Sequence, residues 1–257
     1  MHVNKNYLSI KLFNNKNLTH GFFTRIGGYS KRHLKSLNCS LSNNDNKKIV
    51  IKNRFLALKK LQLEKKKLIL LNQTHSSKVI RINKNNQHKK IIADGLITSL
   101  DNIVIGVLTA DCAPIFIFDT NKKFICCLHS GWKGTLNNIS KKSVKLFDKY
   151  NIERNNLIAI IGPCLATKNY EVEKAFEKKF IDKDSQYCKF FKYKNSTKSF
   201  FNLRGIINFQ LKELGLKKVY NINKDTYANE SLFFSHRRST HKGEKYSGRL
   251  INLISLT

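Results

Sequence analysis

The chain has 257 residues, of which 41% are hydrophobic and 11% aromatic, and this is enough apolar material for a substantial core without disulfides or a structural metal. Such a composition excludes disorder for most of the length, and with only two prolines and twelve glycines we expect one domain over residues 1–257. The formal net charge of +31 raises the question of a polyanionic partner.

The basic residues lack the pattern of a sequence-specific nucleic-acid reader. Only nine of the 48 Lys and Arg residues are arginine, and the lysines are scattered along the whole chain. Specific readers usually concentrate Arg and interleave aromatic side chains. Lys, Asn and Ile are over-used together, as drift toward A+T-rich codons would produce. We therefore expect no specific nucleic-acid partner, and a non-catalytic nucleic-acid-binding protein is our third hypothesis.

The first residues, MHVNKNYLSIKLF, do not have the apolar run of a signal peptide. No later run approaches the roughly 18 apolar residues of a membrane helix. We expect a cytoplasmic, monomeric protein without a membrane partner, whose six cysteines stay reduced. Because no C-x-x-C pair occurs among them, a zinc ribbon is excluded.

In the N-terminal part, short apolar runs at 7–13 and 20–25 predict strands. The polar segment 27–46 follows them and predicts a long loop. Long ordered loops frequently carry functional residues, so this loop points to Arg25 and Asn38.

Further along, a helix over 49–61 places Val50, Phe55, Leu58 and Leu61 near one face. The remaining strands are predicted at 68–71, 79–82 and 91–101, in three apolar runs between 103 and 130, and at 157–164 and 217–222; the remaining helices are predicted at 135–152, 171–181 and 200–216. Residues 182–199 have no clear assignment, and 229–256 form a basic loop between two apolar runs. Because strands and helices alternate irregularly, we predict an α+β fold with mixed sheets.

The segment 103–135 carries the residues on which a functional prediction depends. Cys112 follows Asp111 between two apolar runs, and a third run delivers His129 into a Gly-flanked turn. Upstream, His75 also follows an apolar run. Thiol and imidazole side chains at the ends of neighbouring strands can form a reactive or metal-binding centre.

Two interpretations of this trio remain open from the residues alone. Two imidazoles and a thiolate would bind a tetrahedral Zn²⁺ and leave a fourth position for water or substrate, as in catalytic zinc sites. Alternatively, Cys112 and His129 would form a dyad in which the imidazole activates the thiolate for acyl chemistry. Spacing does not separate the two, because the residues lie far apart in the sequence.

Several motifs occur in order along nearly the whole chain. They are HGFFTRIGGYS, SLN, NQTHSSKV, ADGLITS, LTADCAPIFIFD, CLHSGWKGT, IGPCLATKNYEV and FFSHRRSTHKGEKYSGR. Each motif alone is weak, but together they resemble the full set of the YfiH-like laccase-domain family. The resemblance implies a single-domain α+β fold with layered mixed sheets and a zinc site formed by His75, Cys112 and His129.

The resemblance also implies an activity. Family members act on purine nucleosides, by phosphorolysis of adenosine, inosine, guanosine and methylthioadenosine and by deamination of adenosine. We therefore expect a zinc enzyme with purine nucleosides and phosphate as its partners. A Cys112/His129 amidase that edits peptidoglycan precursors is the second hypothesis, since that role is also attached to the family.

The older name of the family refers to copper-dependent polyphenol oxidase activity. A multicopper oxidase needs many histidines, largely in H-x-H pairs, whereas this chain has eight histidines and no H-x-H pair. We do not expect a true multicopper laccase, although one copper could occupy the zinc site. The chain also lacks the H-x-E and P-C-x-x-C signature of nucleobase deaminases, so any deamination would use a different arrangement of catalytic residues.

Candidate roles follow for individual residues. Cys112 and His129 would be catalytic as well as metal ligands, and Asp111 is a possible proton carrier, although turn-capping or support of the metal site fits it equally. The candidate substrate-binding residues are Arg25, Asn38 and Arg238, with Arg249 and the N-terminus of the helix after Gly134 as further partners for an anion.

Two positions depart from the family pattern. Ser130 and Lys133 stand where the family often has a small residue and Arg, so a planar bidentate contact is lost there. Asp225 stands before Thr226, where many members have cysteine. The second change puts any role of that cysteine in doubt and leaves the proposed zinc ligands untouched.

Overall fold

The computed structural model describes residues 2–13 and 17–257. The strands are β1 (His2–Asn4), β2 (Tyr7–Ser9), β3 (Leu18–Phe23), β4 (Lys67–Leu70), β5 (Val79–Ile82), β6 (Gly95–Thr98), β7 (Ile103–Thr109), β8 (Ala113–Asp119), β9 (Ile125–Ser130), β10 (Leu157–Ile161), β11 (Glu171–Glu173), β12 (Phe191–Tyr193), β13 (Lys198–Phe201), β14 (Lys218–Asn221) and β15 (Leu250–Leu256). The helices are α1 (Lys47–Lys60), α2 (Trp132–Leu136), α3 (Ile139–Asp148), α4 (Lys174–Ile181), α5 (Leu203–Glu213) and α6 (His236–His241).

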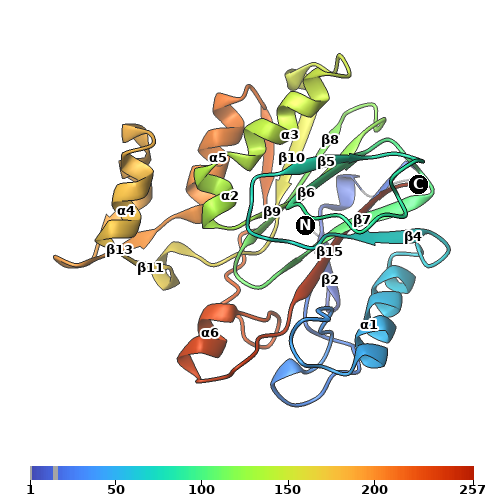
Figure 1. Cartoon of the computed structure of the whole chain (residues 1–257), viewed down its shortest axis with the longest axis horizontal. Helices are drawn as coiled ribbons and strands as arrows, with labels where there is room; N and C mark the ends of the chain where they lie inside the picture. The colour runs from blue at the N-terminus through green and yellow to red at the C-terminus, as the bar shows by residue number, and fades with distance from the viewer. Residues whose placement is uncertain (1, 14–16) are drawn as a thin grey trace.

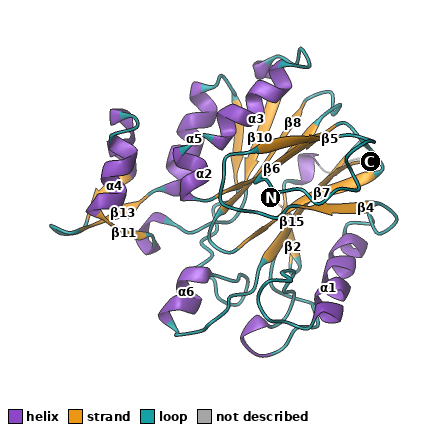
Figure 2. Ribbon diagram, in the orientation of Figure 1, coloured by secondary structure: helices purple, strands orange, loops and turns teal. Residues whose placement is uncertain are grey.

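Two mixed six-stranded sheets make up most of the molecule (Figure 2). The first has the order β1-β2-β3-β15-β7-β4 and the second has the order β14-β10-β8-β9-β6-β5. The pairs β4/β7, β5/β6 and β10/β14 are parallel, and the other pairs in these two sheets are antiparallel. The prediction of an α+β fold with mixed sheets is confirmed.

The two sheets share an apolar core. Phe22 of β3 and Phe116 of β8 are fully buried, and their rings stack with centroids 4.3 Å apart. The second sheet is also covered on its other face, by α3 and α5, while α1 covers the outer face of the first sheet (Figure 1). For this reason every residue of β8 and β9 is buried, and these strands read as continuous apolar runs rather than as alternating ones.

Helix α1 confirms the helix predicted over 49–61, but its buried face differs from the predicted one. Val50 and Leu58 are buried as expected, whereas the side chain of Phe55 is 54% exposed. Asn53 is the buried polar residue of this face. Its amide accepts a hydrogen bond from the backbone N–H of Tyr29 and donates to the carbonyl of Asn38, so the helix holds the predicted loop over 27–46 in place.

The helix predicted over 135–152 is two helices. The chain breaks after α2 because Asn138 adopts a left-handed conformation, with φ of 49°, and its side chain accepts a hydrogen bond from Lys141 N at the start of α3. Helix α2 therefore has only five residues, and the anion site predicted at its N-terminus stays a prediction.

Residues 171–201, partly unassigned from the sequence, form a lobe that projects from the two main sheets (Figure 1). A small sheet of order β11-β13-β12 packs here against α4. Phe176 and Phe180 of α4 contact Phe201 of β13, with ring centroids 5.3 and 4.9 Å apart. The first residues of two predicted helices, 171–181 and 200–216, are strand residues of this sheet.

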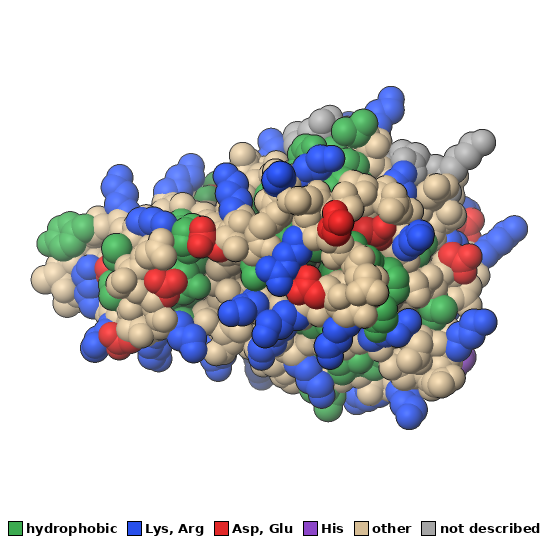
Figure 3. Space-filling view, turned by 90° about the horizontal axis from the view of Figure 1, so that it is seen from above, with side chains coloured by type: hydrophobic (Ala, Val, Ile, Leu, Met, Phe, Trp, Pro, Cys, Tyr) green, Lys and Arg blue, Asp and Glu red, His purple; other side chains and the backbone are tan. Residues whose placement is uncertain are grey.

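The Lys and Arg side chains are spread over the face shown in Figure 3 and are interspersed with apolar, acidic and other side chains. They do not gather into one stripe on this face. Within the described part of the chain, no helix is long and apolar enough to cross a membrane.

Candidate metal centre

The structure brings His75, Cys112 and His129 together. Their metal-binding atoms all lie within 4.8 Å of one another, and the two imidazole rings are 4.9 Å apart at 76°. Cys112 directly precedes β8, and His129 lies near the end of β9, opposite Pro114 in the antiparallel register. His75 lies in the loop after β4, with φ of 57°.

The buried carboxylate of Asp94 holds this trio in place. Its oxygens accept hydrogen bonds from Nδ1 of His129 at 2.8 Å, from the backbone N–H of His75 at 3.1 Å, and from the N–H of Ser76 at 2.6 Å. Burial opposes the charged form, but the bonds from His129 and Ser76 outweigh it and keep the pKa of Asp94 below its usual range. One carboxylate thus orients one imidazole and fixes the loop of the other.

Gly131, which lies between β9 and α2, leaves the space that the trio needs. A Cβ atom at this position would lie 2.9 Å from Sγ of Cys112 and 3.2 Å from Cδ2 of His75. Its φ of −80° is open to any residue, so the requirement for glycine here comes from the close approach of the two side chains.

The electrostatics of the trio favour a thiolate. Burial alone would raise the pKa of Cys112, but the charge of His129 and the hydrogen bonds from His129 and His75 lower it to about 6. Burial would lower the pKa of His129, but Cys112 and Asp94 raise it to about 9. The thiolate is the form of Cys112 that binds a metal or acts as a nucleophile.

The donor set fits a zinc ion. Bonds of about 2.0–2.3 Å around tetrahedral zinc place ligand atoms about 3.3–3.8 Å apart, so a small closure of the three side chains would form the site. His129 uses Nδ1 for Asp94, which leaves Nε2 as its metal-binding atom. A carboxylate behind a histidine ligand is the common support for such sites.

A cavity of about 300 Å³ opens on the trio. Its other lining residues include Gln73, His236 and Arg249. Arg249 donates from one guanidinium nitrogen to the carbonyls of Ser247 and Gly248, at 2.9 and 3.2 Å. Its other guanidinium nitrogens form no hydrogen bond with the described residues, 2–13 and 17–257.

Asp111, a candidate proton carrier, faces away from the trio. Its Oδ1 accepts a 2.6 Å hydrogen bond from the hydroxyl of Thr226. Its Oδ2 accepts from the hydroxyl of Ser235 and from the backbone N–H of Arg237, at 3.0 and 2.7 Å. The carboxylate therefore ties the turn that carries Cys112 to the segment around α6.

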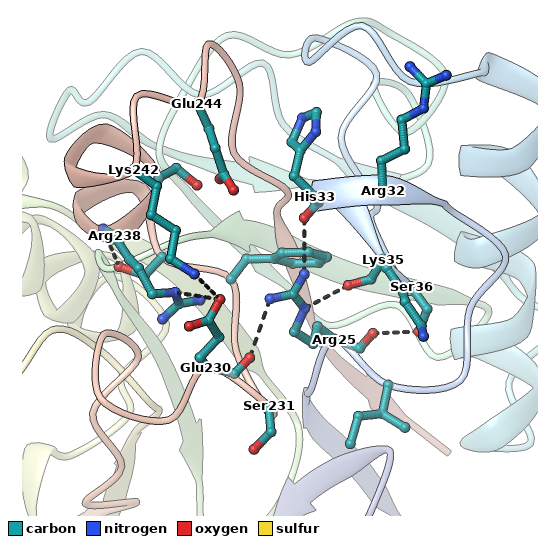
Figure 4. Close-up of a pocket in the computed structure, with 14 residues that line it drawn as sticks. Arg25, Arg32, His33, Lys35, Ser36, Glu230, Ser231, Arg238, Lys242 and Glu244 are labelled. Atoms are coloured by element: carbon teal, nitrogen blue, oxygen red, sulfur yellow. Dashed lines mark hydrogen bonds and ion pairs between the residues drawn. The ribbon is translucent and has the colours of Figure 1, made fainter.

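Arg25 and Arg238 line a second cavity, of about 460 Å³, which shares no lining residue with the first (Figure 4). Arg25 donates to the carbonyls of Lys35, His33 and Glu230. Arg238 is buried and donates to backbone carbonyls at three points, those of Thr226, Tyr227 and Phe233.

Asn38 is fully buried and lies outside the residues that line the metal pocket. Its amide donates to Asp45 and Asn43, and its oxygen accepts from the N–H groups of Ser40 and Arg249. Asn38 thus connects the 38–46 loop to the backbone of Arg249 through hydrogen bonds.

The position that departs from the family pattern, Asp225, has a local role. Its carboxylate accepts hydrogen bonds from the N–H groups of Ala166 and Tyr227 and from the amide of Asn169. It fixes the loop after Cys164. Burial raises the pKa of the Cys164 thiol, which favours an inert core residue.

Sequence reasoning missed Asp94, Gln73 and His236. Asp94 lies within the predicted strand over 91–101, and His236 belongs to a motif quoted above; neither was given a role. The amide of Gln73 donates to the carbonyl of Leu108 and accepts from its N–H, at 2.8 and 2.7 Å, which anchors the His75 loop on β7. Gln73 could have been found from the Q-x-H spacing, because it lies two residues before His75.

A family described as multi-copper polyphenol oxidoreductase laccase matches residues 19–257. The chain belongs to this YfiH-like laccase-domain family. A purine nucleoside phosphorylase of Rickettsia conorii is 36% identical over 193 residues, covering 73% of this chain and 77% of the relative. A purine nucleoside phosphorylase of Haemophilus influenzae is 31% identical over 226 residues, covering 87% and 90%.

Solved structures agree with the family assignment. YfiH of Bacillus licheniformis superimposes with a TM-score of 0.91 at 26% identity, covering 99% of this chain and 97% of that protein. YlmD of Geobacillus stearothermophilus gives 0.89 at 22% identity, covering 100% and 98%, and supports the fold. The YfiH-like fold therefore extends over essentially the whole chain.

Proposed function

We propose that this YfiH-like protein is a zinc-dependent purine nucleoside phosphorylase. The observation that carries the proposal is a single pocket in which the His75–Cys112–His129 donor set lies beside the partly free guanidinium of Arg249. Such a pocket would supply a metal ion and an anion-binding cation to the reaction. The relatives named above, at 36% and 31% identity, carry the name of this activity.

The trio would hold the metal, and Asp94 would keep Nδ1 of His129 protonated so that Nε2 faces the ion. When bound, zinc supplies a Lewis acid that polarises an oxygen of the nucleoside or of phosphate. Copper at the same position is the alternative, and metal analysis of the purified protein decides between the two ions.

Arg249 would bind phosphate in the pocket, since a guanidinium recognises phosphate oxygens through paired N–H donors. A phosphate oxygen then attacks C1′ of the ribose, and the C1′–N9 bond breaks with its electron pair moving to the purine. His236 is the candidate to relay the proton of H₂PO₄⁻ to N7 of the departing base. Burial and the nearby charge of Arg249 lower the pKa of His236, which favours the neutral imidazole.

The pocket volume of about 300 Å³ lies at the lower end of small-molecule sites, consistent with adenosine, inosine, guanosine and methylthioadenosine as the substrate class. Deamination of adenosine needs a free proton shuttle near the metal. Asp94 and Asp111 both accept several hydrogen bonds here, so we place deamination below phosphorolysis as an activity of this pocket.

The roles predicted for Arg25, Asn38 and Arg238 in substrate binding stay predictions. We propose instead that Arg249 and His236 take these roles at the metal pocket. Asp111 would act as a positioning residue for the Cys112 turn rather than as a proton carrier.

The test measures metal content together with release of free base from inosine and adenosine, with and without phosphate. Wild type should contain about one zinc per chain and release base only with phosphate. Cys112→Ala should lose both, while Cys188→Ala, which removes an exposed thiol, should lose neither. Base release that survives without phosphate, or without metal, would refute the proposal.

A Cys112/His129 amidase is the second candidate, because a thiol with a pKa of about 6 beside an imidazole is also the arrangement of a cysteine nucleophile. Chelation separates the two functions. Amidase activity would survive chelation and be lost on alkylation of Cys112, whereas the phosphorylase would be lost on chelation.

A further inference from the structure

The second cavity, of about 460 Å³, lies in a region that the proposed chemistry does not use. Its walls come from the segments 25–36 and 230–244, which are far apart in the sequence. Helix α6 separates it from the metal pocket, because His236 lines the metal pocket whereas Arg238 and Lys242 line the second cavity.

The floor of this cavity is a rigid cationic plane. The guanidinium of Arg25 lies over the ring of Phe234, 4.4 Å from the ring centroid. Its three nitrogens donate to the carbonyls of Lys35, His33 and Glu230, at 2.6, 3.0 and 3.3 Å. Figure 4 shows it at the centre of the cavity. Three of its five N–H groups are used in this way and one face lies on Phe234. The other face of the guanidinium would stack favourably on a planar π system.

The lining of the cavity has an excess of positive charge, because it carries five Lys and Arg side chains and two carboxylates, those of Glu230 and Glu244. Glu230 is paired with Lys242 at 2.5 Å and with Arg238 at 3.7 Å. Arg32 and Lys35 form no ion pair with any residue in the described ranges, 2–13 and 17–257. In Figure 4, Glu230 and Lys242 lie to the left of Arg25, and Arg32 lies at the upper right with its guanidinium directed away from Arg25. Two unpaired cations beside a stacking plane suit a ligand that combines a flat ring with an anionic group.

We propose that this cavity is a binding site for a nucleoside monophosphate. The base would stack on the free face of Arg25, and the phosphate would lie against Arg32 and Lys35. The volume is within the range of small-ligand sites. The site does not depend on the metal pocket, so it can be tested independently of the proposed phosphorylase activity.

The experiment is a calorimetric titration of the Cys112→Ala/Arg249→Ala protein, in which turnover, metal binding and the phosphate contact proposed for Arg249 do not contribute. AMP is compared with adenosine and with inorganic phosphate, and we expect AMP to bind at least tenfold more tightly than either. Equal affinity for AMP and phosphate would overturn the proposal, because the plane of Arg25 would then contribute nothing.

Two variants locate the site. Arg32→Ala/Lys35→Ala should weaken AMP binding at least fivefold. Lys31→Ala/Lys65→Ala removes the same charge from exposed positions outside the cavity and should leave AMP binding unchanged. An equal loss in both double variants would mean that the net charge of +31 attracts AMP without a site.

A third variant tests stacking. Arg25→Lys keeps the charge but removes the plane, so it should weaken AMP and leave phosphate unchanged. Since Arg25 also joins two loops, circular dichroism and a melting curve must first show that this variant folds. If the folded variant binds AMP like the parent, the stacking contact does not exist.

Discussion

Asp94 and His129 form a buried carboxylate–imidazole pair, with Oδ1 of Asp94 2.8 Å from Nδ1 of His129. The same carboxylate accepts hydrogen bonds from the N–H groups of His75 and Ser76. Two of the three candidate metal ligands therefore depend on one side chain that binds no metal itself. This makes Asp94 the most informative position outside the trio.

Replacing Asp94 by Asn should lower zinc affinity by about 10- to 100-fold, because the amide cannot support His129 as a carboxylate does. The zinc dissociation constant, measured by competition with a chelator of known affinity, checks this. Asp101→Asn is the matched control, since Asp101 is exposed and outside the site. Unchanged zinc affinity in Asp94→Asn would mean that the pair does not serve the metal.

The thiol of Cys112 should be unusually reactive in metal-free protein. Because its pKa is lowered to about 6, the thiolate is the main form above pH 6 and is lost as the pH falls below that value. Alkylation by iodoacetamide, followed by mass spectrometry, should therefore reach half of its maximal rate near pH 6. The measurement uses a Cys188→Ser background, which removes the exposed thiol.

Zinc should protect Cys112 from this alkylation at neutral pH. A midpoint near the ordinary thiol value of about 8.5 would contradict the thiolate–imidazole arrangement. Protection by chelator rather than by zinc would contradict the assignment of Cys112 as a ligand.

The clustering of His75, Cys112 and His129 could be predicted because each of them lies at the end of an apolar run, and the ends of neighbouring strands meet in space. The contacts of Asp111 could not be predicted in this way. Its partners Thr226 and Ser235 are 115 and 124 residues away in the sequence, and the residues around Asp111 give no indication of these contacts. The role of Asp94 could not be predicted for a related reason. An Asp–Gly pair is a strong turn signal, and its partner His129 is 35 residues away in the sequence.

The mixed sheets could be predicted from the irregular order of strands and helices, but not the exposure of Phe55. Helical spacing allows either Phe55 or Asn53 on the buried side, and hydrophobicity favoured Phe55. The protein instead buries Asn53, because its amide satisfies polar groups of the loop over 27–46. Hydrogen bonds between the helix and the loop therefore decided which side chain is buried, against the hydrophobic pattern.

Replacing Gly131 by Ala should disrupt the metal site without unfolding the protein. The new Cβ would lie 2.9 Å from Sγ of Cys112, so the thiol or the turn must move. We expect at least a tenfold loss of zinc affinity with a melting temperature close to wild type.

Gly243→Ala is the control for Gly131→Ala. Gly243 has φ of 68° and open space around its Cβ position, so alanine there should cost about 1–2 kcal/mol of stability and no zinc affinity. Equal zinc affinity in the two variants would show that the close approach at Gly131 is unimportant.

Arg249 provides the sharpest test of the proposed phosphate site. If its free N–H groups bind phosphate, Arg249→Lys should raise the KM for phosphate by about 10- to 100-fold, as expected for the loss of a charge-assisted hydrogen bond of about 1.5–3 kcal/mol. The KM for the nucleoside and the zinc content should change little. Arg154→Lys, at an exposed ion pair with Asp148, is the matched control. An unchanged KM for phosphate in Arg249→Lys would place the anion elsewhere in the pocket and remove Arg249 from the mechanism.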